Sequence, residues 1–115
     1  MSIEQLEPGS RFSQVVIHGG LVYLAGHVGT NPAASVRDQT REILVAIDRH
    51  LAMAGTSKSK LLSVSIWLAD ISTFAEMNEA WDAWVDPQNL PARATVEARL
   101  ASPDYRVEIA GIAAI

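Results

Sequence analysis

The sequence contains no cysteine among its 115 residues. This absence excludes disulfide bonds, thiolate metal sites and cysteine nucleophiles, and it favours a cytoplasmic protein over one from an oxidising compartment. Long apolar runs are also missing: no stretch approaches the roughly 20 apolar residues that a membrane span needs, and the acidic N-terminus has no apolar signal segment. We therefore expect a cytoplasmic protein without a membrane partner.

Basic residues are scarce as well. There are nine Lys and Arg against 13 Asp and Glu, a formal net charge of −4, and no extended basic run. Binding to a phosphate backbone depends on clustered basic residues, so we expect no nucleic-acid partner. Hydrophobic residues make up 49% of the chain, with only seven glycines and five prolines. This composition is typical of one globular domain, and we expect residues 1–115 to form it.

The N-terminal half predicts a β-hairpin followed by a helix. Residues 13–18 and 21–25 are β-branched and apolar and flank Gly19-Gly20, which is typical of two strands joined by a tight turn. A helix is expected to begin at Ser35, which has capping-box spacing to Asp38, and to end at Gly55. The apolar residues at helical spacing, which predict its buried face, are Ile43, Leu44, Ile47, Leu51 and Ala54.

The C-terminal half predicts a strand, a helix and two more strands. Residues 61–68 alternate between small polar and large apolar side chains, and a second helix follows the caps Ser72/Thr73 and ends before Pro87. Its expected buried stripe is Phe74, Met77, Trp81 and Trp84. With strands at 93–100 and 105–115, the order becomes β-β-α-β-α-β-β. We expect an α+β fold with one mixed sheet and both helices on one face.

Alternation along the last two strands sorts their residues into two faces. Ala94 and Val96 with Val107 and Ile109 suit packing against helices, whereas the other parity carries Arg93, Thr95, Glu97, Arg106 and Glu108. If the two strands are adjacent, Arg93 and Glu108 come close on this mixed face, which another subunit would cover. Arginine can clamp a carboxylate and glutamate can activate a water. A salt bridge without a catalytic role is the alternative interpretation.

The histidines show no metal-ligand spacing, and no metal site is predicted. We expect His18, beside the hairpin turn, and His50, on a polar helix face, to lie at the surface. His27 directly follows Gly26 at a strand end and is the one histidine placed to line a cleft. Gly26 itself indicates a bulge or a close approach of a ligand to the backbone.

Several motifs together carry a family resemblance. They are Gly-Leu-Val-Tyr-Leu-Ala-Gly at 20–26, Ala-Trp-Asp-Ala-Trp-Val at 80–85, Pro-Ala-Arg-Ala-Thr-Val at 91–96 and Val-Glu-Ile at 107–109. From about Phe12 onward the sequence resembles the RidA (YjgF) family of reactive-intermediate deaminases, and within it the YoaB-like branch of short paralogues. The resemblance implies a chorismate-mutase-like α+β subunit, a homotrimer with sites between subunits, and hydrolysis of enamines or imines such as 2-aminoacrylate to 2-keto acids and ammonia without a cofactor.

The same resemblance implies roles for particular residues. Arg93 would bind the substrate carboxylate and Glu108 would hold the attacking water. The expected substrate-binding residues are Gly26, Thr95 where RidA has a cysteine, Phe12 where it has a tyrosine, His27 where it has a glutamine, and Asn78. Two alternatives stay open: a non-catalytic module that binds a small 2-keto acid, and the RNA cleavage or translation inhibition ascribed to some family members, which the acidic charge disfavours.

Overall fold

The structure is a computed structural model that describes residues 2–115. Within these residues one mixed sheet contains six strands in the order β1-β2-β3-β6-β4-β5. The strands are β1 (Glu4–Pro8), β2 (Ser13–His18), β3 (Leu21–Val28), β4 (Leu61–Leu68), β5 (Ala92–Glu97) and β6 (Val107–Ala114), and the helices are α1 (Val36–Met53) and α2 (Phe74–Trp84). Short 3₁₀ turns at Lys58–Lys60 and Ile71–Thr73 precede β4 and α2.

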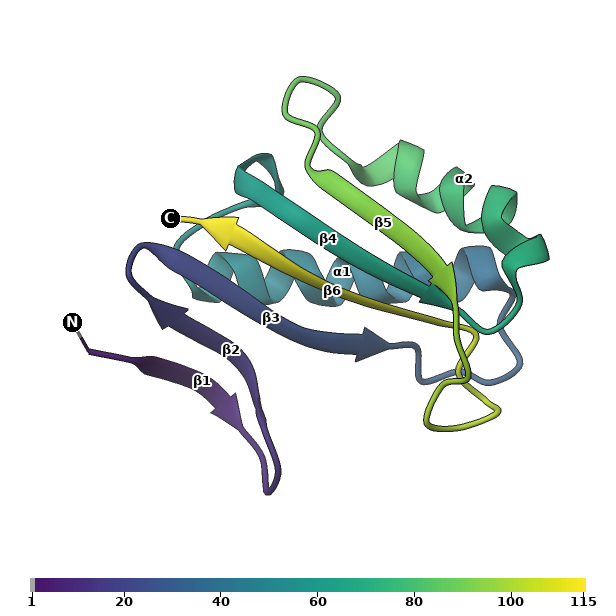
Figure 1. Ribbon diagram of the computed structural model, residues 1–115, viewed down its shortest axis with the longest axis horizontal. Coiled ribbons are helices and arrows are strands. Elements are labelled where there is room, and N and C mark those ends of the chain that lie inside the picture. The colour runs from purple at the N-terminus through teal and green to yellow at the C-terminus, as the bar shows by residue number, and fades with distance from the viewer. Residues whose placement is uncertain (1) are drawn as a thin grey trace.

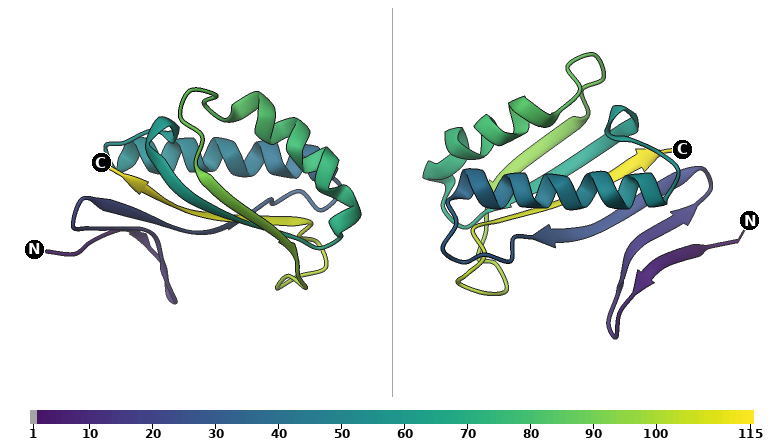
Figure 2. Two further views of the ribbon diagram at one scale, coloured as in Figure 1. Left: turned by 45° about the horizontal axis from the view of Figure 1, so that its top comes forward. Right: turned by 180° about the vertical axis from the view of Figure 1, so that it is seen from behind.

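Both helices cover the same face of the sheet, which confirms the expected α+β architecture. Figure 1 shows the sheet in front of α1, and the reverse view in Figure 2 shows both helices in front of the strands. The other face, which we call the open face, has no helix over it. At one edge, β1 and β2 form a hairpin that bends away from the rest of the sheet (Figure 1). None of the helices in residues 2–115 is long and apolar enough to cross a bilayer.

The local signals at the predicted turn and at both ends of α1 are confirmed, whereas Thr73 begins α2 without accepting a capping hydrogen bond on its side chain. Gly19 and Gly20 have φ of 61° and 77°, the left-handed conformation that a two-residue hairpin turn requires. At the start of α1 the Ser35 hydroxyl accepts a hydrogen bond of 3.1 Å from the Asp38 backbone N–H. Gly55, with φ of 80°, follows the end of the helix.

The core lies between the sheet and the helices. The five apolar residues that predicted the buried face of α1 are all buried, as are Met77 and Trp81 on α2. The ends of the α2 stripe differ, because Phe74 is 41% exposed and Trp84 is only partly buried. Because α2 lies over the edge of the sheet beside β5 (Figure 2), the sheet buries only the middle of its apolar stripe.

Two features of the sheet correct the sequence-based expectation. Strand β1 was not predicted, because Glu4–Pro8 is polar and mostly exposed, as suits a short edge strand. Strands β5 and β6 are not neighbours, because β4 lies between them, parallel to β5 and antiparallel to β6. The chain between β5 and β6, residues 98–106, is long enough to pass the end of β4.

The face assigned to β5 was also wrong. In the register with β4, Arg93 lies opposite Val64 and Thr95 opposite Ile66, and these partners are 3% and 1% exposed in the core. Cross-strand partners share a face, so Arg93 and Thr95 lie on the helix side. Val96 instead lies on the open face, where it is 51% exposed. The reversal occurs because α2 covers the helix side of this edge strand with aromatic and polar side chains.

The assignment for β6 is confirmed. Val107 and Ile109 are buried under the helices, and Glu108 points to the open face opposite Trp67 of β4. Arg93 and Glu108 therefore lie on opposite faces of the sheet within one chain, which contradicts the expectation that strand adjacency brings them together.

Candidate functional site

The first group of candidate residues surrounds Arg93 on the helix side of β5. The Arg93 guanidinium lies 5.1 Å from the Trp81 ring and 5.7 Å from the Phe74 ring, and its Nη1 donates a 2.9 Å hydrogen bond to Asn78 Oδ1. The two rings and the amide all come from α2, which fixes the plane of the guanidinium. Burial lowers the pKa of Arg93 and the Asp82 carboxylate opposes that shift, but an arginine keeps its charge in proteins.

Thr95 extends this group along the same strand. It lies two residues beyond Arg93 on the same face, about 7 Å away at ordinary strand spacing. Its hydroxyl oxygen is buried and has no hydrogen-bond partner within the described residues. A buried hydroxyl without a partner costs free energy, so a further group that bonds to it would be stabilised there. Arg93, Asn78 and Thr95 thus form a partly buried polar group with unused donors, which we call the arginine cluster.

The second group surrounds Glu108 on the open face. A cavity of about 480 Å³ is lined by Phe12, Tyr23, Gly26 and Glu108, together with Ser13, Val16, Leu24 and Ala25. A Cβ at residue 26 would overlap the Glu108 carboxylate, so glycine at this position is what lets the carboxylate lie against the backbone. Phe12, in the β1–β2 turn, is 59% exposed at the rim. We call this group the glutamate cavity.

Glu108 also borders a second hollow on the same face. Together with Trp67 and residues 98–101 of the loop after β5, it lines a cavity of about 240 Å³. The same loop lines a larger cavity of about 630 Å³ at the end of the sheet. No sequence motif marks this loop, since only its position in the fold brings it to Glu108.

The predicted site residues therefore fall into two groups. Arg93, Asn78 and Thr95 lie together, and so do Phe12, Gly26 and Glu108, but the sheet separates the groups within one chain. Because β5 is the edge strand of the sheet, the arginine cluster lies beside an edge that another molecule can approach.

The structure contradicts the expectations for two histidines. His27 does not line the cavity: it is 7% exposed and lies on the helix side, where its side chain contacts His50. His50, expected at the surface, is 3% exposed. His50 lies at helical spacing from Ile47 and Ala54, so the buried stripe of α1 could have revealed its burial. His18 is exposed, as expected.

The arginine cluster offers a cation, and the glutamate cavity offers a carboxylate that can act on a water. Among residues 2–115, no set of three His, Asp or Glu side chains is arranged to hold a metal ion. The arginine cluster can bind a carboxylate in a planar, bidentate manner, and the glutamate cavity can hold a water that Glu108 polarises.

Comparison with known proteins places the chain in a family. The family model described as Endoribonuclease L-PSP matches residues 2–115. The RutC family protein YoaB of Escherichia coli is 44% identical over 115 residues and covers all of both chains. A RutC family protein of Haemophilus ducreyi is 44% identical over 113 residues, covering 98% of this chain and 97% of the relative.

A solved structure gives the same assignment. NMB1025, a member of the YjgF protein family from Neisseria meningitidis, superposes with a TM-score of 0.96 at 44% identity, covering 99% of this chain and 95% of that one. The chain therefore belongs to the YjgF/RutC family, whose family model carries the name Endoribonuclease L-PSP, and the resemblance drawn from its sequence motifs is confirmed.

Proposed function

We propose that this protein hydrolyses reactive enamines and imines of the 2-aminoacrylate type to 2-keto acids and ammonia. The observation that carries the proposal is the way the Arg93 guanidinium is held, with N–H groups left free. Two aromatic rings and Asn78 hold its guanidinium, and within residues 2–115 its one side-chain hydrogen bond goes to Asn78. The remaining N–H groups are oriented and free to bind a carboxylate, the group that every such imine carries.

The proposed reaction divides between the two groups of residues. Arg93 clamps the substrate carboxylate, and the unpaired hydroxyl of Thr95 offers a further hydrogen bond. Glu108 takes a proton from a water as the water oxygen bonds to the imine carbon and the imine nitrogen takes up a proton, which gives a carbinolamine. The proton held by Glu108 then passes to the carbinolamine nitrogen, and the C–N bond breaks as the hydroxyl proton leaves, which releases ammonia and the keto group. An imine is already electrophilic, so positioning supplies most of the catalysis.

A complete site requires assembly, and we propose a homotrimer with three equivalent clefts between subunits. In each cleft Arg93 would face Glu108 of the partner subunit. Two observations support this: the two groups lie on opposite faces of one sheet, and the open face carries exposed apolar side chains. Val96 is 51% exposed and Tyr23 is 41% exposed on this face, and such surface favours a protein partner.

The test uses an amino-acid oxidase to generate imines in the assay and semicarbazide to trap those that survive. We expect wild-type protein to reduce the trapped fraction across several amino acids, Arg93→Ala to abolish the effect and Arg93→Lys to restore little of it, because lysine lacks the planar fork. Arg41→Ala, which removes an exposed arginine of α1, is the matched control and should act as wild type.

Glu108→Gln separates binding from chemistry. The amide keeps the shape of the side chain but cannot take a proton, so we expect KM to stay near the wild-type value and kcat to fall by roughly 10² to 10⁴-fold. An unchanged kcat would remove Glu108 from the reaction, and full activity in Arg93→Ala would refute the carboxylate clamp.

A binding module for small 2-keto acids would use the same Arg93. Saturable keto-acid binding by a wild-type protein that never alters imine trapping would favour that function. The name of the family model points instead to RNA cleavage. With nine basic against 13 acidic residues, the chain offers little attraction for a phosphate backbone, and we expect no cleavage of a fluorogenic RNA by wild type.

A further inference from the structure

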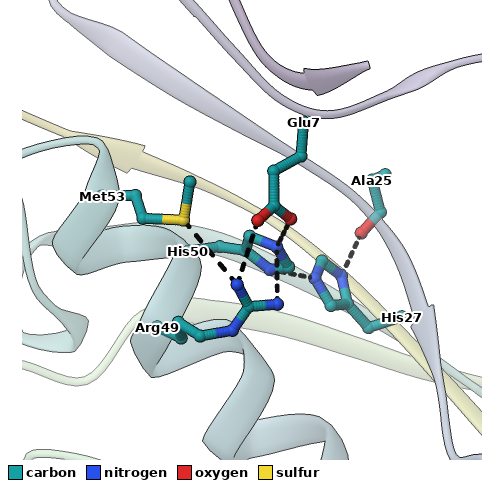
Figure 3. Close-up of polar contacts among 6 residues, drawn as sticks. All are labelled: Glu7, Ala25, His27, Arg49, His50 and Met53. Atoms are coloured by element: carbon teal, nitrogen blue, oxygen red, sulfur yellow. Dashed lines mark hydrogen bonds and ion pairs between the residues drawn. The ribbon is translucent and has the colours of Figure 1, made fainter. Parts of the chain in front are cut away.

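Three side chains distant in sequence form a continuous hydrogen-bonded chain beneath β3 (Figure 3). His27 Nδ1 donates to the Ala25 carbonyl oxygen at 2.6 Å, and His27 Nε2 lies 2.8 Å from His50 Nδ1. His50 Nε2 lies 2.8 Å from Glu7 Oε2. The chain thus joins β1, α1 and β3, and we call it the histidine relay.

The groups at the two ends of the relay, the Ala25 carbonyl and the Glu7 carboxylate, determine how many protons the ring nitrogens carry. A carbonyl and a carboxylate oxygen only accept hydrogen bonds, so three bonds between them require three protons on the four ring nitrogens. Two neutral imidazoles supply only two. Burial lowers the pKa of His27, and the hydrogen bonds from His50 and Arg49 lower the pKa of Glu7, so both favour their deprotonated forms. The third proton therefore belongs to His50, which donates from both nitrogens.

The surrounding charges fit this arrangement. Arg49 Nη1 donates to Glu7 Oε1 at 3.0 Å, so the carboxylate accepts from both basic side chains. Arg49 Nη2 lies 3.4 Å from His50 Nε2, longer than the 2.8 Å bond of that nitrogen to Glu7, so the Nε2 proton points to the carboxylate. The Arg49 cation opposes a second positive charge, and the Glu7 anion favours it. Within residues 2–115 these are the charged groups that contact the two rings.

The 2.8 Å separation of the facing ring nitrogens distinguishes the relay from a metal site. A metal bound to both would need about 2.0 Å to each nitrogen at a tetrahedral angle, which places the nitrogens more than 3 Å apart. A shared proton fits the observed spacing.

The backbone at Glu7 gives a second, independent sign that the relay matters. Glu7 has φ of 47°, the one left-handed φ among the non-glycine residues that the structure describes. A side chain in that conformation costs roughly 1 to 2 kcal/mol, and it persists where surrounding contacts require it. Glu7, the residue of β1 with this left-handed φ, is also the residue whose carboxylate bonds to His50 and Arg49. The relay thus holds β1 against α1.

The other end of the relay holds a β-bulge. In the pairing of β3 with β6, Leu24 lies opposite Gly111 and His27 opposite Ile109, so Ala25 and Gly26 together oppose one residue. Such an extra residue loses ladder hydrogen bonds and redirects its neighbours. His27 bonds to the Ala25 carbonyl from the helix side, while Gly26 meets Glu108 on the open face. The bulge therefore connects the relay to the glutamate cavity.

We propose that Glu7, His50 and His27 are positioning residues that share one extra proton and fix the bulge at residues 25–26, and with it Gly26 beside Glu108, for the proposed reaction. The relay ends on a carbonyl oxygen, which does not take up a proton, so it holds the backbone in place and passes no proton to substrate. Glu7 is 38% exposed, which gives the proton its route to and from water. The kinetic consequence rests on the proposed function, whereas the shared proton does not.

The proton count has a direct test in ring ¹⁵N NMR of wild type and Glu7→Gln. In wild type with the relay formed, we expect one of its two histidines protonated on both nitrogens and the other protonated on Nδ1 alone. The glutamine amide can donate to His50 Nε2, so in Glu7→Gln three bonds form with two neutral rings and no extra proton. Two singly protonated rings in wild type would overturn the shared proton.

The positioning role is tested with His50→Phe, which keeps ring volume and removes both links. We expect the backbone amide resonance of Gly26 to shift, and kcat/KM for imine hydrolysis to fall by roughly 10 to 100-fold, the scale of an ångström-sized misplacement. Glu7→Gln should remain within about twofold of wild type near neutral pH, because its bonds persist.

These readouts separate the relay from the proposed function. A purely structural role would lower thermal stability in His50→Phe without altering the Gly26 amide or kcat/KM, and that result would overturn the positioning role. If wild type itself hydrolyses no imine, the proposed function fails, while the ¹⁵N count and the Gly26 amide still decide the relay. Should His50→Phe not fold, Glu7→Gln still tests the shared proton, and Glu7→Ala, which removes the bonds to His50 and Arg49, tests the positioning role through the Gly26 amide.

Discussion

Gly26→Ala is expected to separate activity from stability. A Cβ at position 26 would overlap the Glu108 carboxylate, which would have to retreat by about 1 Å to reach ordinary contact. A misplacement of that size at a reacting group costs roughly 10²-fold in rate, so we expect kcat/KM for imine hydrolysis to fall by about that factor. Stability should change by no more than about 1 kcal/mol, because the overlap falls on the flexible end of a side chain.

Gly20→Ala provides the matched control. A Cβ there meets no atom, but φ of 77° is unfavourable for alanine and should cost roughly 1 kcal/mol. The two alanine variants should therefore show opposite effects: Gly20→Ala melts earlier with unchanged activity, and Gly26→Ala melts near wild type with little activity. Thermal unfolding and the semicarbazide assay measure both. Wild-type activity in Gly26→Ala would refute the close contact of Gly26 with Glu108 as a requirement for catalysis.

Three further predictions concern stability. Leu51→Ala, at a side chain with 0% exposure, should lower the free energy of unfolding by about 2 to 5 kcal/mol in urea titrations. Ser35→Ala should cost about 1 kcal/mol, with Ser35→Asp near wild type, because the cap needs only an acceptor. Burial holds the pKa of His27 below its ordinary 6.5. The contribution of the neutral ring to the free energy of unfolding is therefore complete above pH 6.5, and it is lost as the pH falls through the lower pKa that His27 has in the folded state. The free energy of unfolding of wild type should therefore decrease from neutral to acid pH. In His27→Gln this decrease below pH 6.5 should be less steep, and equal slopes in the two proteins would count against His27 as its cause.

The helical part of the fold was predictable because its signal is local. In α1 the residues from Ile43 to Ala54 that recur at helical spacing face the sheet of the same chain, so the periodicity of the sequence and the burial in the structure agree. The Ser35 cap and the Gly19-Gly20 turn likewise depend on neighbouring residues alone. Strand β1 carries no such signal, since an exposed edge strand needs no apolar face.

The histidine relay could be predicted only in part. Helical spacing places His50 on the buried stripe of α1, between Ile47 and Ala54, and this position outweighs its charged neighbours. The bond of His50 to Glu7 could not be predicted, because Glu7 is 43 residues away in sequence and lies on strand β1, which the sequence did not predict. A buried polar side chain requires a partner, and the identity of that partner is set by tertiary structure.

The reversal of β5 has a physical origin that bears on the site. Alternation shows which residues share a face of a strand. It does not show which of the two faces packs against the core of the chain, and at an edge strand such as β5 the apolar face need not be that one. On β5 the helix side offers Arg93 two aromatic rings and an amide, while Val96 is left exposed on the open face. A valine that is exposed beside Trp67 is ordinary at an interface between chains. The same geometry that separates Arg93 from Glu108 thus leaves an apolar surface suited to a second copy, and this is why we propose that the site is completed between subunits.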